Sequence, residues 1–124
     1  MADIMIVDDE ALVLFDLCMT VEELGHCVIH DCTSVEDGLR ASDKAVPDAA
    51  LLDIDVGGTP VWPLARKLKS QGALICFVSA NSAHTELDSE FADCLFVDKP
   101  ASPADIEAAL AKMLSPAPRV CQSA

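Results

Sequence analysis

The sequence Ala49-Ala50-Leu51-Leu52-Asp53-Ile54-Asp55 places an unbroken apolar run directly before an acidic loop. Similar apolar runs lie at residues 4–7, 74–78 and 94–97. None of them alternates polar with apolar side chains, as a strand with one face in water would. Strands that are apolar on both sides are typical of a parallel sheet covered by helices on both faces. A weaker strand at residues 26–29 is expected at an edge of this sheet.

The segments between these runs have the periodicity of amphipathic helices. Apolar side chains recur at helical spacing over residues 14–21, 61–68 and 106–113, and a shorter helix opened by Ser34 fits after the edge strand. Residues 81–93 are mostly polar and predict only a short or mobile helix. The alternation predicts an α/β fold: a doubly wound five-stranded parallel sheet, order 2-1-3-4-5, with helices on both faces.

The composition of the 124-residue chain excludes several classes of function. Its 8 Lys and Arg against 21 Asp and Glu give a net charge of −13, so neither nucleic acid nor an anionic membrane is an expected partner. No apolar run approaches the roughly 18 residues that span a bilayer, and no signal peptide precedes the first strand, so a cytoplasmic location is expected. The six cysteines are expected to stay reduced. Residues 1–114 are predicted to form one domain and residues 115–124 a flexible tail.

Candidate functional residues follow the predicted strands. Asp8 and Asp9 follow the first, Asp53 the third, Ser79 the fourth and Lys99 the fifth. Ligands of open α/β sheets bind beyond the carboxyl ends of the strands, and strands 1 and 3 are neighbours in the predicted order. The three acids should therefore converge, and converging carboxylates repel one another unless a cation binds among them. Mg²⁺ suits such a set, because it prefers oxygen ligands and keeps several waters.

A hydroxyl and a lysine beside this acidic site favour phosphoryl chemistry. Ser79 and Lys99, with the metal, can neutralise the charge on the oxygens of a phosphoryl group. The arrangement predicts covalent phosphorylation of Asp53 as the nucleophile. Taken singly, Asp8 and Asp9 would be explained as helix-capping acids and Ser79 as a loop cap, but their shared position at strand ends favours a common site.

Four motifs resemble the receiver domains of two-component response regulators, which have a flavodoxin-like fold. They are Val7-Asp8-Asp9-Glu10, Leu51-Leu52-Asp53, Val78-Ser79-Ala80 and Asp98-Lys99-Pro100. The resemblance covers residues 3 to about 114. It implies that Asp53 accepts a phosphoryl group from a sensor histidine kinase or a phosphotransfer protein, in a reaction that depends on Mg²⁺.

The resemblance also assigns the metal ligands. It implies that Asp9 and Asp53 bind Mg²⁺ directly, that the backbone carbonyl of Asp55 completes the site, and that Asp8 acts largely through water.

The remaining roles come from the same resemblance. Ser79 would contact the phosphoryl group and Lys99 would pair with it. Ser79 and Phe96 would occupy the switch positions, and Pro100 would follow a cis peptide bond.

A narrower resemblance rests on residues 57–65, Gly-Gly-Thr-Pro-Val-Trp-Pro-Leu-Ala. This string is similar to stand-alone receivers that work with HWE-type sensor kinases in alphaproteobacteria. Those receivers carry Thr-Gly-Tyr where this chain has Ser79-Ala80-Asn81. A second departure is Gly57, where most receivers place a proline; glycine makes that loop more flexible.

The sequence thus predicts a single-domain response regulator, a monomer or weak dimer, that signals through protein partners or acts as a phosphate shuttle or sink. It would be no enzyme beyond its own phosphorylation and dephosphorylation. One alternative is a haloacid-dehalogenase-like phosphatase, because Asp53-Ile54-Asp55 matches the D-x-D that opens the D-x-D-x-[TV] motif. In such enzymes, however, the metal-binding acidic pair follows the lysine, whereas Asp8 and Asp9 come first. The other alternative is a receiver-fold interaction module that is never phosphorylated.

Overall fold

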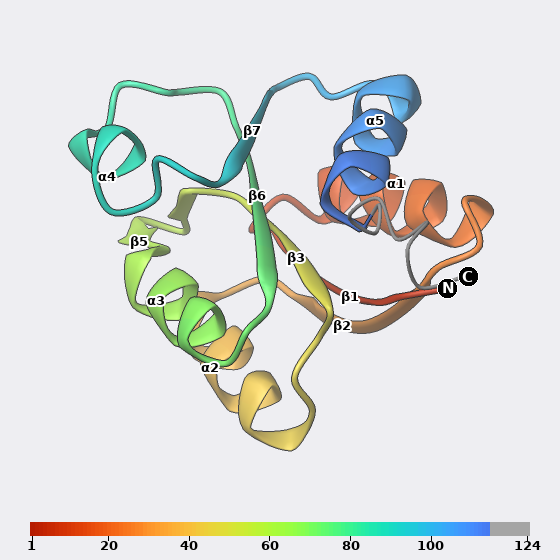
Figure 1. Cartoon of the computed structure of the whole chain (residues 1–124), viewed down its shortest axis with the longest axis horizontal. Coiled ribbons are helices and arrows are strands. Elements are labelled where there is room, and N and C mark those ends of the chain that lie inside the picture. Colours follow the sequence, from red (N-terminus) through yellow and green to blue (C-terminus); the bar gives the residue numbers. More distant parts are fainter. Residues whose placement is uncertain (115–124) are drawn as a thin grey trace, which may run out of the picture.

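A computed structural model describes residues 1–114, and the predicted tail over residues 115–124 lies outside this range. Its centre is a parallel sheet of five strands in the order β2-β1-β3-β6-β7 (Figure 1). The strands are β1 (Asp3–Val7), β2 (Cys27–Cys32), β3 (Ala49–Leu52), β6 (Leu74–Ser79) and β7 (Leu95–Asp98). In chain order this is the predicted 2-1-3-4-5 arrangement, with the weakly apolar strand β2 at one edge.

A small hairpin that the sequence analysis did not predict accounts for the two remaining strands. β4 (Asp55–Val56) pairs antiparallel with β5 (Thr59–Pro60) directly after β3. The hairpin occupies the loop between β3 and the next helix, at the carboxyl edge of the sheet.

Helices cover both faces of the sheet, as the sequence predicts. They are α1 (Ala11–Glu23), α2 (Val35–Lys44), α3 (Trp62–Ser70), α4 (Thr85–Asp88) and α5 (Pro103–Leu114). Figure 1 shows α1 beside α5 on one side of the sheet and α2 beside α3 on the other. The polar segment over residues 81–93 forms only the four-residue helix α4, in agreement with the predicted short helix. No helix within residues 1–114 is long and apolar enough to cross a membrane.

Successive residues of each central strand point into different cores, which explains the unbroken apolar runs. On β3, Ala50 and Leu52 pack towards α2 and α3, whereas Ala49 and Leu51 pack towards α1 and α5. On β6, Phe77 belongs to the first core and Cys76 to the second. Burial raises the pKa of the Cys76 thiol to about 12, so this cysteine is a small apolar side chain at neutral pH.

Local capping fixes where the helices begin. Ser34 Oγ accepts a hydrogen bond of 3.1 Å from the Asp37 backbone N–H at the start of α2. Before α5, Ser102 and Asp105 cap each other: each backbone N–H donates to the other side chain at 3.1 Å. This reciprocal pair satisfies two amides that a helix N-terminus leaves free.

Candidate functional site

The carboxyl ends of β1, β3, β6 and β7 surround a pocket of about 640 Å³. Its walls come from strand ends, the hairpin and the segment before α4. The lining residues are Asp9, Glu10, Asp53, Ile54, Asp55, Pro60, Trp62, Ser79, Ala80, Asn81, His84, Glu86 and Lys99. The residues that the sequence analysis placed at strand ends therefore share one cavity, with Asp8 immediately behind it.

Asp53 is the buried acid of the pocket, with 8% of its surface exposed. Its backbone N–H donates to the Val7 carbonyl at 2.9 Å, which extends the pairing of β1 with β3 by one residue. Its Oδ1 accepts a hydrogen bond of 2.8 Å from the Ile54 N–H. Burial raises the pKa of Asp53; the Lys99 ammonium opposes this rise, and the negative charge of Asp8 adds to it.

Three carboxylates converge as predicted: one oxygen from each of Asp8, Asp9 and Asp53 lies within 4.8 Å of the others. Asp8 is fully buried, and its Oδ1 accepts a hydrogen bond of 2.9 Å from the Glu10 N–H. Its Oδ2 faces the Lys99 ammonium at 2.7 Å. Three converging carboxylates, two of them buried, are a donor set that fits a hard cation such as Mg²⁺.

Lys99 bridges two of these acids. Its Nζ lies 2.7 Å from Asp8 Oδ2 and 3.2 Å from Asp53 Oδ2. The contact with Asp8 is an ion pair at close range, and the contact with Asp53 is a hydrogen bond from the ammonium. Burial lowers the pKa of Lys99, but the two carboxylates outweigh burial and raise it, so the side chain is a fixed positive charge at neutral pH.

Backbone pairing holds Lys99 in place. Its N–H donates to the Ser79 carbonyl at 3.1 Å, which ties the end of β7 to the end of β6. The peptide bond between Lys99 and Pro100 is cis, as the receiver resemblance implies.

Ser79 lies in the pocket, but its hydroxyl is engaged by its own loop. Its Oγ accepts a hydrogen bond of 3.3 Å from the Asn81 N–H and donates to the Asn81 carbonyl at 3.5 Å. Phe96 is half-buried in β7 opposite Phe77 and packs against the core beneath α2 and α3. Its predicted switching role stays a prediction.

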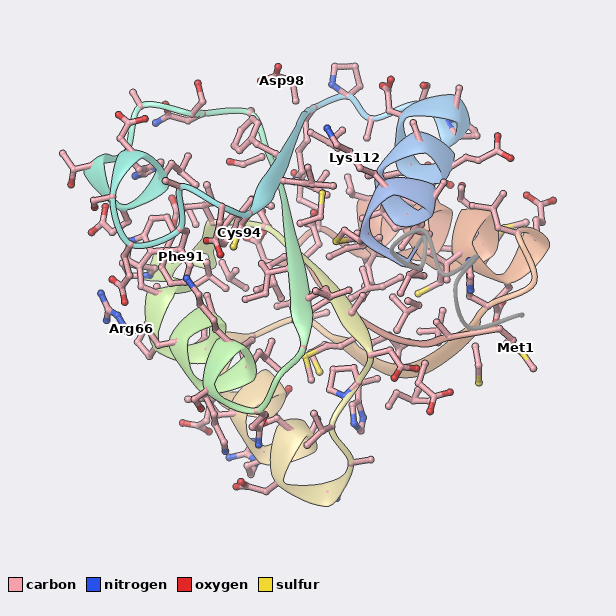
Figure 2. The ribbon with its side chains drawn as sticks, in the orientation of Figure 1. Met1, Arg66, Phe91, Cys94, Asp98 and Lys112 are labelled. Atoms are coloured by element: carbon pink, nitrogen blue, oxygen red, sulfur yellow. The ribbon has the colours of Figure 1, made fainter. Side chains whose placement is uncertain are left out.

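Trp62 is a wall of the pocket whose role the sequence left open. Its ring stacks on Phe91 at a centroid distance of 5.5 Å and meets the His84 ring edge-on at 5.6 Å. Arg66, one turn further along α3, pairs with Glu90 at 2.6 Å, and Figure 2 shows its side chain extending outwards from α3. These contacts fasten the segment after α4 to α3.

Two further features were missed by the sequence analysis. The Gly57 N–H donates to Asp9 Oδ2 at 3.1 Å, which brings the hairpin onto the acidic cluster. On α1, the side chains of Leu12, Phe15 and Met19 are 80%, 60% and 44% exposed. The buried side of α1, formed by Leu14, Leu17 and Val21, is the one that the helical spacing predicted. The sequence analysis did not single out the apolar side chains on the opposite, exposed side.

No protein-family model and no curated protein matches the chain. Solved structures do. The response regulator PhyR from Brucella abortus matches with a TM-score of 0.79 and 24% identity over 92% of this chain, which spans 48% of that protein. The receiver (REC) domain of Erythrobacter litoralis PhyR matches with a TM-score of 0.78 and 20% identity, covering 92% of this chain and 90% of that one.

A third solved structure extends this likeness. The isolated REC domain of RcsB from Salmonella enterica serovar Typhimurium, solved in the presence of the phosphomimetic BeF₃⁻, matches with a TM-score of 0.79 and 20% identity. The alignment covers 92% of this chain and 88% of that domain. The three comparisons establish that the chain has the fold of response-regulator receiver domains.

Proposed function

We propose that this chain is the receiver of a two-component system and that Asp53 accepts a phosphoryl group in a reaction dependent on Mg²⁺. The observation that carries the proposal is the position of Lys99, whose ammonium lies 3.2 Å from Asp53 Oδ2 and 2.7 Å from Asp8 Oδ2. This geometry supports the proposal because a buried carboxylate, a protonated lysine and two further acids lie together at one point of the sheet edge.

The chemistry at Asp53 is a displacement at phosphorus. Oδ1 accepts the Ile54 N–H and Oδ2 accepts a hydrogen bond from Lys99; we assign the attack to Oδ2, because it lies beside the positive charge that the phosphoryl oxygens require. Oδ2 forms a bond to phosphorus while the P–N bond of a phosphohistidine donor breaks, and the electron pair of that bond leaves with the imidazole nitrogen. Lys99 stabilises the charge on the phosphoryl oxygens and remains protonated throughout, in keeping with its raised pKa.

Mg²⁺ would bind Asp9, Asp53 and the backbone carbonyl of Asp55 directly and Asp8 through water, and it would neutralise charge on the phosphoryl oxygens. The residues of the chain hold this arrangement together. Asp8 sits fully buried behind the site and fixes the Lys99 ammonium, while the backbone N–H of Asp53 anchors the nucleophile to β1.

The output is a rearrangement of the loop after β6. To contact a phosphoryl group on Asp53, the Ser79 hydroxyl has to leave its hydrogen bonds with Asn81. That exchange would draw residues 79–81 inwards, and Phe96 on the neighbouring strand would respond. The result is a signal passed to protein partners, or a phosphate shuttle or sink, by a protein that catalyses only its own phosphorylation and dephosphorylation.

The exposed face of α1 supports a protein as the donor. We define the α1 stripe as Leu12, Phe15 and Met19, all exposed, with α1 beginning two residues after Asp9. The first 39 residues contain no Lys or Arg, so α1 itself carries acidic side chains and no basic ones. A complementary partner is a helix with an apolar stripe and basic flanks. The proposed source of the phosphoryl group is a sensor histidine kinase, of the HWE type under the narrower resemblance, or a phosphotransfer protein. The proposed location of the chain is accordingly the cytoplasm.

The experiment that tests the proposal is intact mass spectrometry after incubation with acetyl phosphate, with and without Mg²⁺. The native protein should gain one phosphoryl group only with Mg²⁺, and Asp53→Asn should gain none. Asp55→Asn is the matched control, because it removes a neighbouring acid but keeps the backbone carbonyl, and it should still be phosphorylated. A native protein that gains no mass and binds no beryllofluoride with Mg²⁺ would refute the function. Turnover of a generic phosphate ester would point to a phosphatase instead.

A further inference from the structure

The turn at the tip of the β4–β5 hairpin has a backbone conformation that favours glycine. Gly57 and Gly58 have φ angles of 61° and 84°, both in the left-handed region. Two left-handed residues between paired antiparallel strands make the tight hairpin turn that Gly and Asn adopt most readily. The position of the Gly57 N–H is therefore set by this particular turn.

The base of the hairpin is fixed to the core. Val56 and Val61 are buried among the side chains beneath α2 and α3. The Val61 N–H donates to the Ile54 carbonyl at 2.8 Å and closes the loop immediately after Asp53. Because the base is fixed, the direction of the exposed tip depends on the turn itself.

The tip reaches a residue 48 positions away in the sequence. The Gly57 N–H donates to Asp9 Oδ2 at 3.1 Å. Asp9 is exposed, and the negative charges of Asp8 and Asp53 push its carboxylate outwards. A backbone N–H donated to a carboxylate is a strong, charge-assisted hydrogen bond that opposes this repulsion. It takes one acceptor position, and the carboxylate keeps others for a cation.

We propose that the Gly57–Gly58 turn is a positioning element of the cation site: it holds the Asp9 carboxylate beside Asp53 and thereby sets the affinity for Mg²⁺. The inference rests on the Mg²⁺ site of the proposed function. Gly57 does not touch the cation and acts through Asp9. Hydrogen-bond partners that orient a metal ligand in this way commonly change metal affinity about 10- to 100-fold when they are lost.

The surroundings of the turn allow a clean test. Within residues 1–114, no heavy atom beyond Gly57 and its two chain neighbours lies within 4 Å of the position that a Cβ would take at Gly57. A substitution therefore meets no clash, and its effect comes from the backbone alone. Gly72, at the other end of α3, has a φ of 89° and equally open surroundings, so it is a matched control far from the acids.

The experiment titrates Mg²⁺ into the full chain without any phosphoryl donor. Calorimetry and the fluorescence of Trp62, the single tryptophan and part of the same pocket, give the Kd. Gly57→Val should raise the Kd about tenfold or more. Gly57→Asn should stay within about threefold of the native value, because Asn tolerates the left-handed turn. Gly72→Val should bind as the native protein does.

Circular dichroism verifies that each variant is folded, and Gly57→Ala replaces Gly57→Val if the valine variant is not. A folded Gly57→Val or Gly57→Ala variant with native Mg²⁺ affinity would overturn the positioning role and leave the proposed function standing. Equal weakening in Gly72→Val would also overturn it, because the effect would then be general destabilisation. A native chain that binds no Mg²⁺ would overturn the positioning role and the cation site together.

Discussion

The two helical layers of the molecule differ in how many of their charged side chains form ion pairs and in how many apolar side chains they leave exposed. On the side of α2 and α3, four basic side chains form ion pairs: Arg40 with Glu36 and Asp37, Lys67 with Asp43, Arg66 with Glu90, and Lys69 with Asp93. On the other side, α1 forms no ion pair within residues 1–114, and it exposes the apolar α1 stripe. One layer pairs most of its charges within the chain, whereas the other leaves apolar and acidic side chains exposed.

The difference separates side chains that stabilise the fold from side chains that are free to contact another protein. The α2/α3 layer buries a close contact between the two helices: a Cβ at Gly38 would lie 2.6 Å from Leu64 Cδ2. Packing of that kind contributes to folding and is sensitive to every change in volume. The exposed side of α1 contributes little to folding, so its apolar side chains are free to serve recognition.

The largest expected effect is a loss of stability on the α2/α3 side. Leu64 is fully buried, and Leu64→Ala should lower the free energy of unfolding by about 2–5 kcal/mol. The matched substitution on α1, Leu12→Ala, should change it by no more than about 0.5 kcal/mol, because Leu12 is exposed. Urea denaturation measures both values. Comparable losses from the two variants would contradict the division between the layers.

The second effect concerns recognition and should appear on α1 alone. Phe15→Ala should slow phosphoryl transfer from a histidine kinase about tenfold or more, because an aromatic residue at the centre of an interface carries much of its binding energy. Transfer from acetyl phosphate should not change. Leu74 is also exposed but lies at the opposite end of the sheet, so Leu74→Ala should behave as the native protein with both donors. Equal loss with both donors would place the Phe15 effect in the chemistry rather than in docking.

The third effect concerns Asp53, which follows β3 in the sheet between the two helical layers. Its pKa is raised in the folded chain, chiefly by burial. Stability therefore falls as the pH rises from the ordinary carboxyl value through the raised one, because ionising the buried group is unfavourable. Without divalent cations, Asp53→Asn should increase the free energy of unfolding at neutral pH. This gain should vanish in acid below the ordinary value of about 3.9, where the native carboxyl is protonated in both states. Thermal melts of both proteins from neutral pH to acid measure the difference. A stability gain in Asp53→Asn that persists in acid would contradict the expectation.

The smallest effect is expected at an exposed ion pair of the α2/α3 layer. Hydrogen bonding and the charge of Arg66 lower the pKa of Glu90. Arg66→Gln should let that pKa return towards its ordinary value, as an NMR titration of the Glu90 carboxyl would reveal. The slight stabilisation from the pair is present at neutral pH and lost as the pH falls through the lowered pKa. Arg40→Gln, on α2, should leave the Glu90 titration as it is.

Much of the fold and part of the site could be predicted from local sequence. The apolar run over Ala49–Leu52 was informative because a strand buried on both faces has no polar side chain to offer. The convergence of Asp8, Asp9 and Asp53 followed from strand order, since parallel strands end at the same edge. The hairpin at residues 55–60 could not be predicted, because two-residue strands are too short to produce a periodic pattern.

The sequence by itself determined the parallel sheet, its helical layers and the identity of the acids and the lysine at the strand ends, because these depend on periodicity and on the chemistry of single side chains. Only the tertiary structure decided which groups touch. The bridge from Lys99 to Asp8 and Asp53, and the hydrogen bond from Gly57 to Asp9, join residues that are distant in sequence. Such contacts depend on the relative placement of loops at one edge of the sheet, and no local pattern encodes that placement.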